Sequence, residues 1–190
     1  IDVARKNLKD FKNIKFKKRS LDNTGLKKNS QDFGYVLGVL HHVPNIRKAI
    51  KSCVQLLKSK KPILIYIYYS FDNRPYWFGL MARFSNLFRL IICRFPSIIK
   101  FLICDVIALI IYFPIAKFLN FANKLNFRPK NFPLYWYRNS SLYVMRNDSR
   151  DRFGTPLEKR FSKKEIHKMM LDAGLEKIKF KKSSPFSLEF

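Results

Sequence analysis

Continuous apolar residues mark two segments, 33–40 and 63–69, that we expect to be buried strands. Between them Pro44 and Asn45 begin a helical pattern, in which Asn45 is the expected N-cap, and Pro62 follows its end. The apolar positions of this helix are Ile46, Ala49, Ile50, Cys53, Val54 and Leu57. Two apolar strands joined by a helix predict a parallel pair with a right-handed crossover, which places the chain in the α/β class.

Helical or alternating patterns occur on both sides of this unit. Residues 1–11 place their apolar side chains on one helix face, and residues 14–18 alternate as a short strand. Residues 76–92 form an amphipathic helix with Gly79, Arg83 and Asn86 on its polar side. Its apolar side carries Trp77, Leu80, Met81, Phe84, Leu87, Phe88 and Ile91.

Residues 98–119 are the most apolar stretch of the chain. Charged residues interrupt this stretch at Lys100, Asp105 and Lys117, so the longest uncharged run is the 11 residues from 106 to 116. A spanning helix needs about 20 largely apolar residues, and a central Asp costs about 2.5–3.5 kcal/mol on insertion scales. We therefore expect a packed or membrane-touching helix here, with a true membrane span as the alternative.

The C-terminal third begins with an aromatic and Arg-rich segment, residues 127–160, that we interpret as a long functional loop. Ser162 and Glu165 then form a capping box, and Gly174 ends the helix that it starts. Residues 175–181 are expected to be a strand, and 185–190 the beginning of another.

Charge and cysteine content narrow the possible partners and compartment. The chain has 38 Lys+Arg against 13 Asp+Glu, a net charge of +25. Such a charge attracts anionic surfaces, but the basic residues are spread along the chain and form no known RNA- or DNA-binding module, so nucleic acid is not the expected partner. Three cysteines without C-x-x-C spacing argue against disulfides and favour the cytoplasm or its membrane surface.

The chain begins at Ile1, without Met and within a helical pattern. We interpret it as a fragment whose N-terminal part is missing.

One segment resembles a known family. The sequence from Asp32 to Pro44, DFGYVLGVLHHVP, resembles the fourth-strand motif of the class I S-adenosylmethionine-dependent methyltransferases. Residues 1–8 look like the helix after that family's second strand, and residues 13–16 like its third strand. Residues 163–174 look like its last helix.

The resemblance implies a Rossmann-like methyltransferase sheet that is truncated at its N-terminus. Residues 1–69 would be a partial cofactor-binding core, and residues 161–190 its C-terminal helix and strands. Residues 70–160 would be a helical insertion after the fifth strand, with the substrate loop. The family's glycine-rich loop and the acidic residue after its second strand are absent, and both would lie upstream of Ile1.

The same resemblance implies S-adenosylmethionine as cofactor. Its contacts would come from two strand ends, and the residues concerned are Ser20, Leu21, Asp22, Leu37, Gly38 and His41. Either Ser20 or Asp22 would meet the adenine. Leu37 and Gly38 would approach the cofactor, or else simply pack in the core. His41 would be a cofactor contact or general base, or an ordinary strand-end histidine. The adjacent His41 and His42 point in different directions, with no other ligand at suitable spacing, so we expect no metal site.

Substrate-binding residues are expected after the fifth strand and on the long loop. They are Tyr69, Asp72, Arg74, Tyr143, Arg146 and Arg152. The alternative is a solvated loop whose arginines pair locally with Asp148 and Asp151.

The function implied is methyl transfer to an unknown acceptor by an intact parent enzyme, with little activity in the fragment alone. The alternative is a non-enzymatic, basic protein that touches a membrane surface or a partner through residues 76–119.

Overall fold

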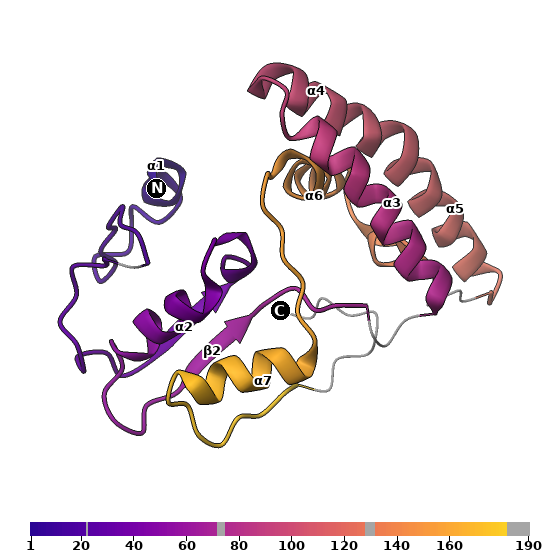
Figure 1. Cartoon of the computed structure of the whole chain (residues 1–190). Coiled ribbons are helices and arrows are strands. Elements are labelled where there is room, and N and C mark those ends of the chain that lie inside the picture. The colour runs from indigo at the N-terminus through magenta and orange to yellow at the C-terminus, as the bar shows by residue number, and fades with distance from the viewer. Residues whose placement is uncertain (22, 72–74, 128–131, 182–190) are drawn as a thin grey trace. The chain divides into compact units, whose positions relative to one another are not determined.

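The chain forms two compact units, each described here by itself. The structure is a computed structural model, and it describes residues 1–21, 23–71, 75–127 and 132–181 (Figure 1). Unit 1 comprises Ile1–Ile67 and Lys164–Ile178. Unit 2 comprises Tyr68–Lys163 together with the C-terminal residues from Lys179.

A parallel strand pair forms the centre of unit 1. Strand β1 (Gly34–Leu37) pairs with β2 (Ile63–Tyr66) in a register that runs from Gly34 opposite Ile63 to Leu37 opposite Tyr66. Helix α2 (Ile46–Val54) connects them. Its N-cap Asn45 accepts a hydrogen bond through Oδ1 from the Lys48 amide at 3.0 Å. The predicted strand–helix–strand unit, its parallel pairing and its cap are confirmed.

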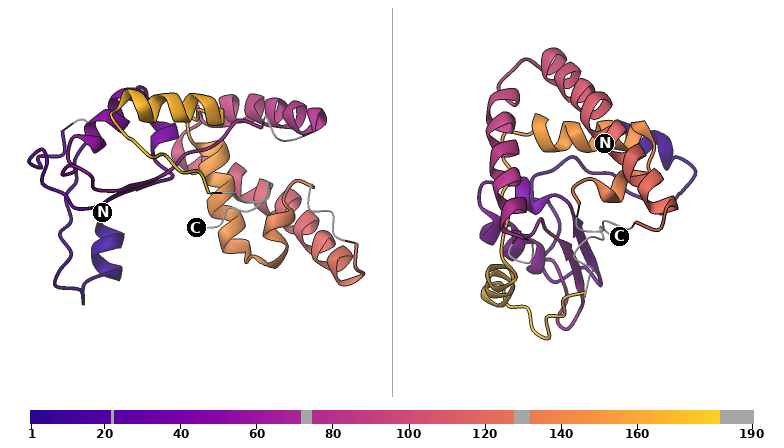
Figure 2. Two further views of the ribbon diagram at one scale, coloured as in Figure 1. Left: turned by 90° about the horizontal axis from the view of Figure 1, so that it is seen from below. Right: turned by 90° about the vertical axis from the view of Figure 1, so that its right-hand side faces the viewer.

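Helices α2 and α7 (Lys163–Asp172) supply most of the core of unit 1. Its buried apolar side chains are Leu40, Ile46, Ala49, Ile50, Cys53, Leu57, Ile67, Ile166 and Met169. An ion pair of 2.6 Å between Arg47 Nη1 and Asp172 Oδ2 joins the two helices. The two helices therefore lie side by side, as Figure 2 also shows.

The prediction that both strands are buried on both faces is wrong. Tyr35 is 69% exposed and Leu64 is 55% exposed, and Leu37 is exposed beside them. The burial pattern alternates along β1 because α2 and α7 cover one face of the pair, while no element in the described residues of unit 1 covers the other.

Two further predicted strands are not strands in the structure. Residues 14–18 and 175–181 have irregular backbone, and α1 (Asp2–Asn7) is shorter than the helix expected over residues 1–11. A strand needs a hydrogen-bonded neighbour, and the described ladder of unit 1 contains β1 and β2 only. The strand expected at 185–190 lies outside the described residues.

Unit 2 is helical. It contains α3 (Tyr76–Ile92), α4 (Ser97–Ile107), the π-helical turn η2 (Ala108–Tyr112), α5 (Phe113–Lys124), the 3-10 turn η3 (Tyr135–Asn139) and α6 (Leu142–Gly154). The predicted helix at 76–92 is confirmed. Residues 97–124 form one continuous helical rod. Its π turn precedes Pro114, which has no amide hydrogen to donate and whose ring would crowd the preceding turn of a regular α-helix.

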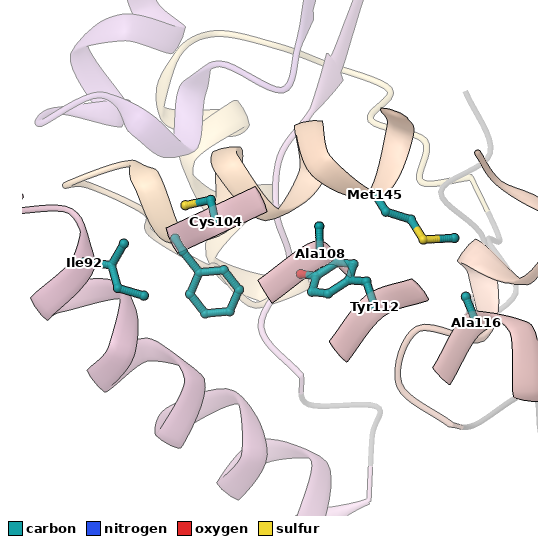
Figure 3. Packing of buried hydrophobic residues seen from close by; sticks show 7 residues of the cluster. Ile92, Cys104, Ala108, Tyr112, Ala116 and Met145 are labelled. Carbon is teal, nitrogen blue, oxygen red and sulfur yellow. The ribbon is translucent and has the colours of Figure 1, made fainter. Parts of the chain in front are cut away.

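The core of unit 2 lies where the rod meets α6 (Figure 3). It contains Ile92, Cys104, Ala108, Tyr112, Ala116, Met145 and Phe153. Three small side chains and one tyrosine of the rod therefore face inward, and α6 contacts both α3 and α4.

The interpretation of residues 127–160 as a loop is wrong over most of its length, because η3 and α6 occupy it. Ser141 caps α6 by accepting a hydrogen bond at Oγ from the Val144 amide at 3.4 Å. Helix α6 has few apolar residues, but Met145, Ser149 and Phe153 follow one another at i, i+4 and i+8 and are buried. Ser149 Oγ donates a hydrogen bond to the Cys104 carbonyl at 2.7 Å, so a polar residue forms part of the buried contact between α6 and α4.

Candidate functional site

The carboxyl end of β1 is the candidate cofactor site of unit 1. The chain turns there at Gly38, whose φ is +66°, and the Gly38 amide donates to the Tyr66 carbonyl at 3.3 Å. A Cβ added at Gly38 would have no heavy atom within 4 Å. The glycine is therefore required by its backbone conformation and is not packed against a neighbour. Open space beside a strand end is what close approach of a ligand to the backbone needs.

Gly34, by contrast, is a packing position. A Cβ there would lie 3.5 Å from Ile63 Cγ1 and from Leu57 Cδ2. Leu37, at the end of the same strand, is exposed on the uncovered face. The predicted core role of Leu37 is not what the structure shows, and both Leu37 and Gly38 border accessible space.

The turn η1 (Leu40–His42) holds the two adjacent histidines directly after this strand end. His41 is fully buried, and its ring centroid lies 4.1 Å from that of His42 at an interplanar angle of 56°. A general base must come within hydrogen-bond reach of the proton that it removes. A catalytic role for His41 stays a prediction, and it would require a ligand to reach an enclosed ring.

The other predicted cofactor residues lie in the loop before β1. Ser20 is exposed and accepts a backbone hydrogen bond from the Asn23 amide at 3.1 Å. Leu21 is half-buried, and Asp22 lies outside the described residues. An adenine contact from this loop stays a prediction.

The predicted substrate residues belong to unit 2, and the two described arginines among them have partners on other helices. Arg146 Nη2 pairs with Asp105 Oδ2 of α4 at 2.6 Å. Arg152 Nη2 donates to Ser85 Oγ of α3 at 2.7 Å. The alternative, local pairing of these arginines with Asp148 and Asp151, is therefore also incomplete, because α6 directs them across to α3 and α4.

The two tyrosines of the predicted substrate set lie in a different environment from the two arginines. Tyr69 is exposed and forms a parallel bridge with Phe161, and Tyr143 is exposed on α6. Asp72 and Arg74 lie outside the described residues. The structure does not bring the described members of this predicted set into one pocket.

A pocket in unit 2 is lined instead by residues that the sequence left out of the substrate set. It has a volume of about 440 Å³ and is lined by Ser70, Phe71, Gly79, Ala82, Arg83, Asn86 and Glu158. The sequence did place Gly79, Arg83 and Asn86 on the polar side of α3, and this was the available signal. The sequence around Glu158 contains no pattern that would predict this residue to line a pocket.

An ion pair supports one wall of this pocket. Arg160 Nη2 lies 2.7 Å from Glu158 Oε1. The guanidinium also lies over the ring of Phe71, with 4.5 Å from Cζ to the centroid. Burial lowers the pKa of Arg160, and the neighbouring Glu158 charge opposes that shift. The pair fixes Glu158 in place and leaves Arg83 as an exposed cation at the pocket.

Unit 2 also contains a carboxyl group in a low-dielectric setting. Burial raises the pKa of Asp148, and hydrogen bonds from Tyr137 and Tyr112 oppose the shift. Burial in turn raises the pKa of Tyr112 and of Tyr137, so both phenols remain protonated donors. Asp148 of α6 therefore forms a buried polar cluster with Tyr112 and Tyr137.

Among the described residues, no group of three or more His, Cys, Asp and Glu side chains is placed to hold a metal ion. The three cysteines are free thiols, and burial raises the pKa of Cys53 and of Cys104.

Comparison with known proteins finds a match, and it lies in unit 1. Residues 1–65 match the family model described as Methyltransferase domain. The resemblance to methyltransferases is thereby confirmed for about one third of the chain. The matched segment of the methyltransferase family includes α1, β1, the turn at Gly38, both adjacent histidines and α2, and it ends within β2. No curated protein and no solved structure matches the chain.

Proposed function

We propose that unit 1 is part of an S-adenosylmethionine-dependent methyltransferase, in which the end of β1 approaches the cofactor. The observation that carries this proposal is the open, left-handed turn at Gly38 within the segment that matches the methyltransferase domain. In open α/β sheets, ligands bind beyond the carboxyl ends of parallel strands. Gly38 and the exposed Leu37 lie at such an end.

The residues present fit part of the cofactor. The backbone at Leu37 and Gly38 would lie against it, and the loop containing Ser20 would offer a polar edge. Residues 1–33 contain one glycine, Gly25, so the glycine-rich turn typical of this cofactor's methionine site has no counterpart before β1. The finer assignment of a truncated Rossmann-like sheet with an insertion rests on this difference and on the chain order of unit 2 after β2.

The bound cofactor would supply an activated methyl group on a sulfonium. The work left to the protein is to orient the acceptor in line with that group and to exclude water, which is an orientation effect worth several kcal/mol. An acceptor oxygen or nitrogen would also need its proton removed, and His41 is the nearest candidate base along the chain. The acceptor remains unassigned.

The test is calorimetric titration of S-adenosylmethionine into the complete gene product that contains these residues. We expect the wild type to bind the cofactor and Gly38→Asn to bind it at least tenfold more weakly. The Asn side chain would occupy the space in which the cofactor approaches the protein backbone at residue 38. Asn tolerates the left-handed conformation, so the fold should persist.

Gly174→Asn is the matched control. Gly174 also has a positive φ, +90°, and a Cβ added there would likewise meet no heavy atom within 4 Å, but it follows α7 and belongs to neither predicted cofactor segment. The affinity of this variant should equal that of the wild type. No binding by the wild type, or equal binding by both variants, would overturn the proposed site.

A further inference from the structure

In unit 2, many large apolar side chains of α3 and of the rod are exposed, whereas the helices of a water-soluble domain bury their apolar side against the core. The stripe of α3 that carries Ser85 and Arg89 faces the protein: Arg89 is only 7% exposed and donates through Nη1 to the carbonyls of Thr155 and Pro156, each at 2.9 Å. Ser85, on the same side, accepts the hydrogen bond from Arg152 of α6. The seven large apolar residues that share the other side of α3, from Trp77 to Ile91, are between 42% and 63% exposed. We call them the α3 apolar face.

The rod of α4, η2 and α5 repeats this arrangement. Most of its buried positions are small, namely Cys104, Ala108, Ala116 and Ala122, and Tyr112 and Leu119 are its two large buried side chains. Large apolar side chains point away from the core, and we call them the α4–α5 apolar face: Ile98, Ile99, Leu102, Val106, Leu109, Ile110, Ile111, Phe118 and Phe121. Small residues at helix contacts with large ones outside are typical of helices that lie in lipid.

The rod is also long and apolar enough to cross a membrane by length and composition. This applies to residues Ser97–Lys124, and only 17% of its most apolar window is buried. A soluble core helix of the same composition would bury most of that window. Two separate apolar faces of this size exceed what a monomer in water normally exposes.

Helix α6 determines how such a rod could meet a bilayer. It packs along α4 and η2 and carries Arg146, Arg150 and Arg152. Two of these arginines hold Asp105, which lies eight residues inside the rod from its first residue, Ser97. A crossing rod would draw these charges into the hydrocarbon, whereas a rod lying flat keeps α6 on the water side.

The charges of the helical segment match an anionic surface. Residues 75–127 contain six basic residues, Arg83, Arg89, Arg94, Lys100, Lys117 and Lys124, and one acidic residue, Asp105, which is already paired. Lys117 Nζ lies over the Phe113 ring at 5.2 Å, so its stem follows apolar surface while the ammonium stays accessible. Arg94, which follows the end of α3, and Lys124, the last residue of the rod, are both exposed.

We infer that unit 2 is a membrane-docking module, which lays the α3 and α4–α5 apolar faces into the interfacial layer of an anionic lipid bilayer and keeps α6 in water. This inference is independent of methyl transfer. It concerns where the chain resides, and it stands or falls on lipid binding alone.

The test is cell-free synthesis of the chain with vesicles of 30% phosphatidylglycerol and 70% phosphatidylcholine, followed by flotation on a density gradient. We expect the wild type to float with the vesicles. Flotation should fall on pure phosphatidylcholine and in 0.5 M salt, because charge attraction adds to apolar burial.

The variant Ile110→Asn/Phe118→Asn removes two outward side chains of the rod, and we expect at least a tenfold lower partition into vesicles. Val3→Asn/Phe11→Asn is the matched control, since these two exposed apolar residues belong to unit 1. It should float like the wild type.

Depth is measured with a single tryptophan. Leu109→Trp in a Trp77→Phe/Trp136→Phe background should be quenched most by lipids brominated near the headgroup. Quenching at the bilayer midplane would overturn the flat arrangement. A wild-type chain that stays in solution as a defined oligomer, and loses that association in Ile110→Asn/Phe118→Asn, would show that a second copy covers these faces and would overturn the inference.

Discussion

Arg150 of α6 holds Asp105 of α4 with two parallel hydrogen bonds. Arg150 Nε lies 2.7 Å from Oδ1 and Arg150 Nη2 lies 2.6 Å from Oδ2. Arg146 Nη2 adds a third bond to Oδ2 at 2.6 Å. The two guanidinium groups lower the pKa of Asp105 from 3.8 to about 2. Bidentate pairing of this kind fixes both distance and orientation between two helices.

The first prediction concerns acid stability of unit 2. Because the folded pKa of Asp105 is depressed, its contribution is fully present above pH 4 and is lost as pH falls toward 2. We expect about 1–2 kcal/mol of unfolding free energy to depend on this group, allowing for its partial exposure. Asp105→Asn should lower stability at pH 7 by about that amount and flatten the loss between pH 4 and 2. Trp77 and Trp136, the two tryptophans of the chain, both lie in unit 2, so their fluorescence reports its unfolding.

Asp148 provides the contrasting substitution on the same helix. Its pKa is raised by burial, so the ionised form disfavours the fold, and stability declines as pH rises from 3.8 through the raised folded pKa. Asp148→Asn should therefore be neutral or mildly stabilising at pH 7 and should gain on the wild type as pH increases. Urea titrations at pH 3.5 and pH 7.5 compare the two. A loss at pH 7.5 as large as that of Asp105→Asn would contradict this account.

Arg89 is expected to be essential for the turn after α6. It donates to two carbonyls, those of Thr155 and Pro156, and Arg89→Met would leave both without this donor in a part-buried setting. The expected loss is about 2 kcal/mol of unfolding free energy. Arg83→Met on the same helix is the control, because Arg83 is exposed; it should change stability by less than about 0.5 kcal/mol. Equal effects in the two variants would show that the buried contacts do not matter.

Gly38 should tolerate residues according to their backbone preference. Gly38→Val places a β-branched residue at φ +66° and should cost about 1–2 kcal/mol or more in unit 1. Gly34→Ala adds a methyl at ordinary contact distance without a conformational penalty and should cost less. Amide hydrogen exchange of β1 and β2 measures the difference locally. Faster exchange in Gly34→Ala than in Gly38→Val would show that packing, not the turn, controls this strand end.

Local patterns along the chain determined β1, α2, β2, α3 and the start of α7. Continuous apolar runs, an Asn cap and a capping box each depend on neighbours within a few residues, so they can be detected without tertiary information. The methyltransferase resemblance belongs to the same level, because the motif around Gly38 and His41 is continuous in sequence.

Only the tertiary structure decided which faces these elements bury. The pattern of α3 gives an apolar side and a polar side, but the stripe that faces the protein is the one with Arg89 and Ser85, because these residues meet partners 66 and 67 residues away. Helix α6 was missed for the same reason: its core contact with α4 runs through Ser149, and its arginines are directed by Asp105. Burial is a property of whatever lies opposite a side chain, and a single sequence does not state what that is.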